Sequence, residues 1–172
     1  MLYSLLPVPL VMLINKSTAE TGDSTSVYNK TEKKILYSYH IVVFLLLIYS
    51  IFLPLQLGTT WFYIGLPICL LGLITYTMVM VSFATISLDV EPMTKGLYRY
   101  SRHPMYLTSS LMFIGVSVAC ASWVFLLFSI VYTILSLISV IPEERFLLEK
   151  YGDAYREYIN RTPRYIGMPK SG

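Results

Sequence analysis

Residues Gly96–Tyr106 read Gly-Leu-Tyr-Arg-Tyr-Ser-Arg-His-Pro-Met-Tyr and crowd two arginines, a histidine and three tyrosines at the start of a long apolar segment. Pro104 has a fixed φ and no backbone N–H, so it suits the first turn of a helix. Its ring pushes His103 out of the helical region. We therefore predict an ordered polar lead-in over Gly96–His103 and a membrane helix from Pro104 onward. The free N–H groups at the start of that helix can bind an anionic group, so a cofactor-binding edge is predicted here.

The composition is that of a membrane protein. Of the 172 residues, 55% are hydrophobic and 13% are charged, whereas soluble domains carry about 25% charged residues. A single membrane domain over residues 1–172 is expected. All thirteen lysines and arginines fall within Lys16–Lys34, Lys95–Arg102 and Arg145–Lys170. The positive-inside rule predicts that these basic regions and the C-terminus are cytoplasmic. Because the basic residues lie beside membrane spans, nucleic-acid binding is not expected.

The apolar segments predict an all-α fold, a polytopic membrane helix bundle with four transmembrane helices. The expected spans are Ile35–Gln56, Trp61–Thr85, Pro104–Cys120 and Val124–Ile141. Met1–Ile14 is also apolar, but a helix of that length reaches only about 21 Å of the roughly 30 Å hydrocarbon core. It is interpreted as a partial, tilted or re-entrant first segment, with a signal anchor as the alternative. Asn15–Lys34 is polar and is predicted to be a surface loop.

Small residues mark one face of the second predicted span. Gly65, Cys69 and Gly72 recur there at helical spacing. Such a face lets a neighbouring helix approach closely. Cys69 and Cys120 belong to no Cys-x-x-Cys or metal-ligand pattern, so no metal site is expected.

The last two spans are joined by a very short link at Ala121-Ser122, so they must pack as an antiparallel hairpin. Both ends of the hairpin then open to the same side. This arrangement is expected to bring His103 near Glu143, although forty residues separate them.

The chain after the hairpin is predicted to form another helix, which starts at Pro142. Its apolar and aromatic side chains recur at spacings of four, four and three, at Leu147, Tyr151, Tyr155 and Tyr158. Charged residues are interspersed around this face. We predict a C-terminal amphipathic helix at the membrane interface, interrupted at Gly152 and closed by Pro163.

Each polar residue near the predicted edge has an ordinary and a functional interpretation. His103 either caps a helix and faces headgroups or contacts a cofactor. Tyr98 and Tyr106 are either interface anchors or the walls of an adenine or sulfonium pocket, because an aromatic face attracts a cation. Arg102 either pairs with lipid phosphate or holds a carboxylate.

Glu143 and Glu144 allow two interpretations as well. In the first turn of a helix, acidic side chains complement the helix dipole. Alternatively, one carboxylate accepts hydrogen bonds from a ribose diol. An acidic group at membrane depth is costly without a partner, which makes the pair a candidate site.

The stretch from Gly96 resembles the lead motif of the isoprenylcysteine carboxyl methyltransferase and phospholipid methyltransferase group of integral membrane enzymes. That family carries Gly-x-Tyr-x-x-x-Arg-His-Pro-x-Tyr, and every fixed position is present here. A hairpin, a Glu-Glu pair and a Phe/Tyr-Gly-x-x-Tyr-x-x-Tyr element follow in the family. In this chain the last two are Glu143-Glu144 and Tyr151–Tyr158, so the likeness covers roughly Val90–Ile166.

The resemblance implies methyl transfer from S-adenosylmethionine to a lipidic or small hydrophobic acceptor at the cytoplasmic membrane face. It divides the chain into an N-terminal segment with spans over residues 1–86 and a cofactor-binding region over residues 87–166. Carried over by aligned position, the cofactor contacts are Val90, Glu91, Pro92, Met93, Tyr98, His103, Pro104, Met105, Tyr106 and Glu143. No catalytic acid or base is assigned, because a sulfonium is already activated. Membrane lipids are the other expected partners.

This chain departs from the family pattern on the substrate side. In the prenylcysteine branch an arginine stands one helical turn before the nucleoside-contacting glutamate and faces the substrate, whereas Ser139 occupies that position here. A prenylcysteine carboxylate would thus lack its expected partner. Arg102 and Ser139 are assigned to the substrate side. Val90 and Glu91 also replace the more usual His and Lys.

Two other functions compete with methyl transfer. Membrane sterol reductases have a similar Arg-His-Pro-x-Tyr segment and use NADPH, but they are much longer and have more spans. A non-catalytic scaffold that binds lipid headgroups is the second alternative. Glu143-Glu144 counts against the scaffold, because a headgroup site would favour more basic residues.

Overall fold

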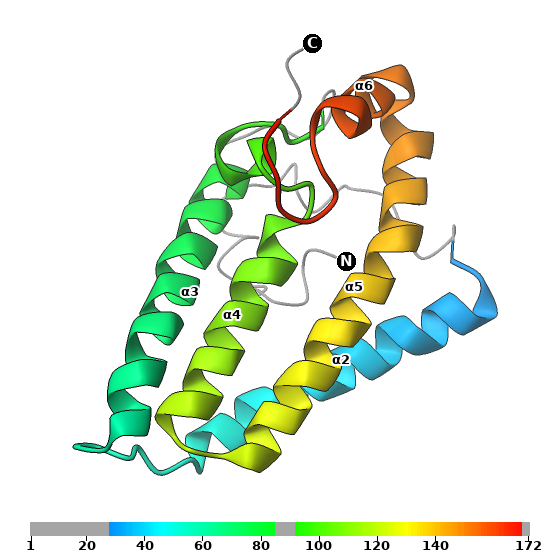
Figure 1. Cartoon of the computed structure of the whole chain (residues 1–172). Coiled ribbons are helices and arrows are strands. Elements are labelled where there is room, and N and C mark those ends of the chain that lie inside the picture. Colours follow the sequence, from blue (N-terminus) through cyan, green and yellow to red (C-terminus); the bar gives the residue numbers. More distant parts are fainter. Residues whose placement is uncertain (1–27, 85–91, 170–172) are drawn as a thin grey trace. The chain divides into compact units, whose positions relative to one another are not determined.

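The computed structural model describes residues 28–84 and 92–169, and over these ranges it contains helices and no strand. The elements are α2 (Lys30–Ile51), α3 (Thr60–Ala84), the 3-10 helix η4 (Gly96–Arg99), α4 (Pro104–Ala119), α5 (Trp123–Tyr151) and α6 (Asp153–Arg161) (Figure 1). The all-α prediction is confirmed for this part of the chain. Met1–Ile14, predicted as a partial first segment, lies outside the described residues.

Three of the helices, α2, α3 and α5, are long and apolar enough to cross a membrane. The helix α4 is also apolar but has 16 residues, which reach about 24 Å of a roughly 30 Å core. Large apolar side chains stand exposed along α2, α3 and α5, among them Phe44, Leu71 and Leu127. Lipid tails solvate such side chains as well as a protein core does. The exposed faces are therefore typical of helices that contact lipid.

The contacts divide the chain into two compact units. The terminal unit comprises, among the described residues, 28–34, 78–84, 92–104 and 139–169. The bundle unit comprises Ile35–Thr77 and Met105–Ile138. The lead-in and the Glu143-Glu144 pair thus belong to the same unit.

In the bundle unit, α3 and α4 lie side by side with their backbones in close approach (Figure 1). Three pairs meet in antiparallel register, Gly65 with Ala119, Cys69 with Gly115 and Gly72 with Met112. A β-carbon added at Gly72 would lie 2.7 Å from the Met112 Cα atom, which is closer than van der Waals contact allows. The close packing predicted from the small-residue face is confirmed.

Three hydroxyl-bearing side chains form a fully buried cluster in the bundle unit: Tyr39 of α2, Ser109 of α4 and Tyr132 of α5. The Tyr132 hydroxyl lies 2.7 Å from Ser109 Oγ and 3.5 Å from the Tyr39 hydroxyl. Ser109 also donates to the Met105 carbonyl at 2.6 Å. Polar groups in a hydrocarbon environment need internal partners. The cluster provides them and ties the three helices together near the start of α4.

The helix α2 begins at Lys30, inside the segment that was predicted to be a loop. The Asn29 side-chain oxygen accepts a hydrogen bond from the Glu32 backbone N–H at 2.9 Å, and Glu32 Oε2 accepts one from the Asn29 N–H at 2.8 Å. This reciprocal pair is a capping box, which satisfies two donors of the first turn. The polar residues before the apolar run therefore start the helix.

The helix α5 continues through Pro142, so the prediction that a new helix starts there is wrong. A proline inside a helix removes one hydrogen bond and costs about 3 kcal/mol. Contacts of the next turn hold the helix together, because Glu143 and Glu144 are buried against His103 of the lead-in and Glu144 forms an ion pair with Arg102. The interpretation of these two residues as a first-turn complement to the helix dipole is wrong for the same reason.

Gly152 separates α5 from α6 and has a φ of +55°. Glycine adopts this conformation readily, whereas other residues rarely do. The interruption predicted at Gly152 is confirmed, and it divides the predicted aromatic face between two helices. Tyr155 and Tyr158, both on α6, are buried.

Candidate functional site

The lead-in Gly96–His103 is ordered, as predicted, and consists of η4 followed by a bend. Gly96 opens it in the left-handed region at φ +63°. Ser101 Oγ then accepts a hydrogen bond from the His103 backbone N–H at 3.1 Å. Pro104 follows directly as the first residue of α4. The bond to Ser101 fixes the backbone of His103 just before the helix.

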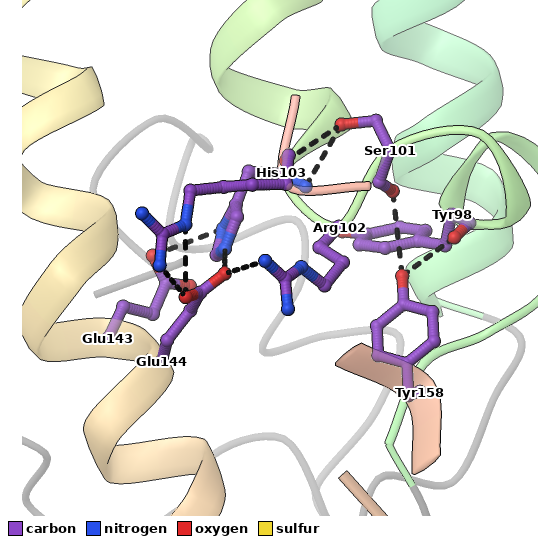
Figure 2. A network of polar contacts seen from close by, with 8 residues as sticks. Tyr98, Ser101, Arg102, His103, Glu143, Glu144 and Tyr158 are labelled. Carbon is purple, nitrogen blue, oxygen red and sulfur yellow. Dashed lines mark hydrogen bonds and ion pairs between the residues drawn. The ribbon is translucent and has the colours of Figure 1, made fainter. Parts of the chain in front are cut away.

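Glu144 is the centre of the polar network in the terminal unit (Figure 2). Its Oε1 atom lies 3.1 Å from Arg102 Nη2 and 3.2 Å from His103 Nε2. Its Oε2 atom accepts two hydrogen bonds from Arg164, at 3.1 Å from Nε and 2.7 Å from Nη2. Arg102, His103 and Glu144 are all buried, so the contacts among them form out of water, where charge-assisted bonds are strong, whereas the half-exposed Arg164 keeps its bonds to Glu144 partly in solvent.

Glu143 lies on the other side of the imidazole. Its Oε2 atom is 3.8 Å from His103 Nδ1, and both side chains are buried. The expected meeting of His103 and Glu143 is confirmed. The histidine thus stands between two carboxylates, with the closer contact to Glu144.

The residues after α6 form a strap, Thr162–Gly167, that runs along the lead-in. The Arg102 N–H donates to the Pro163 carbonyl at 3.1 Å, and the Gly167 N–H donates to the Tyr100 carbonyl at 3.1 Å. Near the end of α6, the Tyr158 hydroxyl donates to the Tyr98 carbonyl at 2.7 Å (Figure 2). Backbone and side-chain bonds therefore hold the strap and α6 against the residues that precede His103.

Replacing Arg164 by glutamine tests what the strap contributes to the site. Glutamine cannot form the paired bonds to Glu144, and we expect a loss of about 1 kcal/mol of unfolding free energy, because the arginine is half exposed. Looser restraint of Glu144 and His103 should also weaken cofactor binding severalfold. Thermal unfolding and ligand titration in detergent measure the two effects.

Arg156→Gln is the matched control for the Arg164 substitution, because Arg156 is exposed on α6 and pairs only weakly with Asp153. Equal behaviour of the two variants would contradict a positioning role of the strap.

An ion pair between Glu32 and Arg145 joins the start of α2 to the part of α5 that follows Glu144. Arg145 Nη2 lies 2.6 Å from Glu32 Oε2, the same carboxylate that closes the capping box. Tyr28, just before this helix, is buried. Burial raises the pKa of Tyr28, and the negative charge of Glu143 acts in the same direction. Tyr28 is therefore an uncharged neighbour of Glu143.

Contacts connect four of the residues predicted from the sequence. His103 and Glu143 meet directly, Arg102 shares Glu144 with His103, and the Tyr98 carbonyl accepts the bond from Tyr158. The other predicted residues of the terminal unit are Pro92, Met93, Pro104 and Ser139, while Met105 and Tyr106 belong to the bundle unit. Val90 and Glu91 lie outside the described residues.

Sequence reasoning named Glu144 only as a member of the Glu-Glu pair, and it missed Arg164 of the network and the neighbouring Tyr28. The Glu-Glu pair was noticed, but nothing local distinguishes which carboxylate takes the ion pairs. Arg164 and Tyr28 sit in polar stretches near the two ends of the chain, where no periodicity marks a contact. The only available signal for Arg164 was its position just after Pro163.

Two buried side chains keep polar atoms without a hydrogen-bond partner among the described residues. They are Arg102, through Nε and Nη1, and Tyr155, through its hydroxyl. Burial raises the pKa of Tyr155, and Glu144 and Glu143 act in the same direction, so the hydroxyl stays protonated and can donate. Free buried donors beside buried carboxylates suit a ligand that carries both acceptor and donor groups.

Comparisons with known proteins agree with this geometry. A family model for phospholipid methyltransferases matches residues 55–154, which is more than half of the chain and includes His103, Glu143 and Glu144. Over 78 residues the chain is 37% identical to methanethiol S-methyltransferase 1 of Bradyrhizobium diazoefficiens. That alignment covers 45% of this chain and 27% of the relative, so the chain matches about a quarter of the relative's length. The matched family and the long apolar helices together show that the chain belongs to the phospholipid methyltransferase family of membrane methyltransferases.

Proposed function

We propose that the protein transfers a methyl group from S-adenosylmethionine to a lipidic or small hydrophobic acceptor at the cytoplasmic face of a membrane. The observation that carries the proposal is the contact of His103 with Glu143 and Glu144, which joins two family motifs in a buried polar network. The similar Bradyrhizobium enzyme is named for methylating methanethiol, which is a small apolar thiol. An acceptor of that character would reach the site through the bilayer.

The residues present fit this cofactor. Glu143 would accept hydrogen bonds from the ribose, beside His103. Pro92, Met93, Tyr98, Pro104, Met105 and Tyr106 are carried over as further contacts, with Val90 and Glu91 before them. The unpartnered donors of Arg102 supply a place for an acceptor oxygen of the ligand.

The bound cofactor supplies an activated methyl group on a sulfonium, so the protein needs no strong acid or base. Its own residues would bind and orient the donor, align the acceptor and exclude water. Buried side chains such as Met93, Tyr98 and His103 suit the exclusion of water. Ser139 in place of an arginine favours an acceptor other than a prenylcysteine acid, because serine cannot form an ion pair with a carboxylate.

The proposal includes a membrane topology. In it the chain has four spans, of which α4 is the third and pairs with α5, and the modest length of α4 is met by local thinning of the bilayer. The helix α6 lies at the interface with Tyr155 and Tyr158 turned inward. All basic regions and the C-terminus are cytoplasmic by the positive-inside rule. The chain forms one membrane domain over residues 1–172, with the cofactor-binding region over residues 87–166.

Calorimetric titration of the detergent-purified protein tests the function. We expect binding of S-adenosylmethionine and S-adenosylhomocysteine but not of NADPH. Binding of NADPH alone would support the reductase alternative. Folded protein that binds none of the three would support a non-catalytic scaffold.

Glu143→Gln tests the role of the carboxylate in that pocket. The amide keeps the size of the side chain but accepts hydrogen bonds from a diol less strongly, so affinity for S-adenosylmethionine should fall about fivefold or more. The variant should remain folded, because Glu144 retains its ion pairs with Arg102 and Arg164. Glu157→Gln, on the exposed face of α6, is the control, and unchanged affinity of the Glu143 variant would remove that carboxylate from the site.

A further inference from the structure

The Arg102 guanidinium is buried but only partly used. It is 9% exposed, and Nη2 alone has an acceptor, Glu144 Oε1. Nε and Nη1 have no partner among the described residues. A buried charged donor without an acceptor is costly, and native proteins rarely leave one so. The position of Arg102 therefore points to an acceptor group that belongs to a ligand.

Glu144 cannot supply this missing acceptor. Its Oε1 atom already receives Arg102 Nη2 and His103, and its Oε2 atom receives both bonds from Arg164. Two arginines thus converge on one carboxylate, and the group of three keeps one net positive charge. Glu143, on the other side of His103, brings the sum of the four charges to zero, so an anion at the free edge of Arg102 would be bound by that guanidinium itself and not by a net positive field.

Tyr155 carries the second unused donor. The side chain is 2% exposed, and its hydroxyl has no partner among the described residues. Burial raises the pKa of Tyr155, the charges of Glu144 and Glu143 act in the same direction, and the charge of Arg102 opposes them, so the hydroxyl and the guanidinium belong to one group of interacting charges. Two unpaired buried donors in one region, one charged and one neutral, suit the oxygens of a carboxylate.

We propose that the free nitrogens of Arg102 and the Tyr155 hydroxyl bind the α-carboxylate at the amino-acid end of the methyl donor. The identity of the ligand rests on the proposed function. That the site formed by Arg102 and Tyr155 binds a carboxylate rests on their unpaired donors. The assignment separates two roles: Glu143 serves the ribose, and Arg102 with Tyr155 serves the opposite end of the cofactor. It also moves Arg102 from the substrate side, where the sequence placed it, to the donor side.

The test compares S-adenosylhomocysteine with its decarboxylated analogue, S-adenosyl-3-thiopropylamine, by calorimetric titration of the whole 172-residue chain. Wild-type protein should bind the carboxylate-containing ligand about tenfold or more tightly. Arg102→Lys keeps a cation for Glu144 but offers fewer, differently placed donors. In that variant the two ligands should bind within about twofold of each other.

Tyr155→Phe separates ligand binding from folding. Because the hydroxyl is unpaired in the free protein, its removal should leave the midpoint of thermal unfolding unchanged or slightly higher. The preference for the carboxylate ligand should nevertheless fall about threefold or more. Tyr63→Phe, on an exposed ring of α3, should leave both affinities unchanged.

The outcomes are distinct. Loss of the preference for the carboxylate ligand in both site variants, with Tyr155→Phe as stable as the wild type, would support the proposed carboxylate site. Equal affinity of the wild type for the two ligands, or the same preference in all variants, would contradict the proposed carboxylate site but not the proposed methyltransferase function. Absence of binding of either ligand to folded wild-type protein would overturn both.

Discussion

Glu144→Gln should abolish measurable binding of S-adenosylmethionine and lower the midpoint of thermal unfolding by about 10 °C. The glutamate is the shared acceptor for Arg102, His103 and Arg164. Glutamine has one acceptor oxygen and no charge, so the buried Arg102 cation would lose its counter-ion. Removing one partner of a buried pair costs about 3 to 5 kcal/mol, because the other charge stays buried.

Thermal unfolding in detergent and ligand titration measure both parts of this result. Glu149→Gln is the matched control, since Glu149 is an exposed carboxylate on the same helix α5. The control should keep the midpoint and the affinity of the wild type. A Glu144→Gln variant that unfolds within about 2 °C of the wild type would contradict the role of Glu144 as the centre of the network.

The second large effect is expected where α3 and α4 touch. A β-carbon at Gly115 would lie 2.5 Å from the Cys69 Cα atom, so Gly115→Val must force the two helices apart. Overpacking a well-packed contact costs about 1 to 3 kcal/mol, and displaced backbone raises the cost. We expect Gly115→Val to yield little folded protein, and Gly115→Ala to unfold at a clearly lower temperature than the wild type.

Size-exclusion profiles and thermal unfolding of the purified variants check this expectation. Val124→Ile adds a methyl group on an exposed position of α5 and serves as the control, with an unchanged midpoint. Wild-type stability in both Gly115 variants would mean that α3 and α4 are not held at the distance described here.

Several features of this protein follow from the sequence alone because they depend on local stereochemistry or on periodicity. Pro104 restricts its own backbone and that of His103, so the start of α4 could be predicted to the residue. Gly65, Cys69 and Gly72 lie on one face of a helix wherever that helix packs, so the close approach of a neighbour could be predicted too. Gly152 marked the end of a helix, since few other residues adopt its conformation.

Other features were decided by tertiary contacts. By its local preference Pro142 starts a helix, yet α5 runs through it, because the buried contacts of Glu143 and Glu144 with the lead-in hold the next turn. The hairpin predicted that His103 meets the Glu-Glu pair, but a small rotation of a helix decides which of two adjacent carboxylates is the acceptor. In the structure Glu144 contacts Arg102, His103 and Arg164, whereas Glu143 contacts His103 at a longer distance.

The contacts of the strap and of the start of α2 could not be predicted from the sequence. Arg164 and Glu32 find partners at Glu144 and Arg145 that lie 20 and 113 residues away. Such pairs have no signature in spacing, because any exposed cation could match any exposed carboxylate until the backbone is placed. The apolar segments, the small-residue face of α3 and the motif at Gly96–Tyr106 were enough to predict an all-helical fold, one close helix contact and the class of chemistry. Only the folded chain decided which buried charges are paired and which donors remain for a ligand.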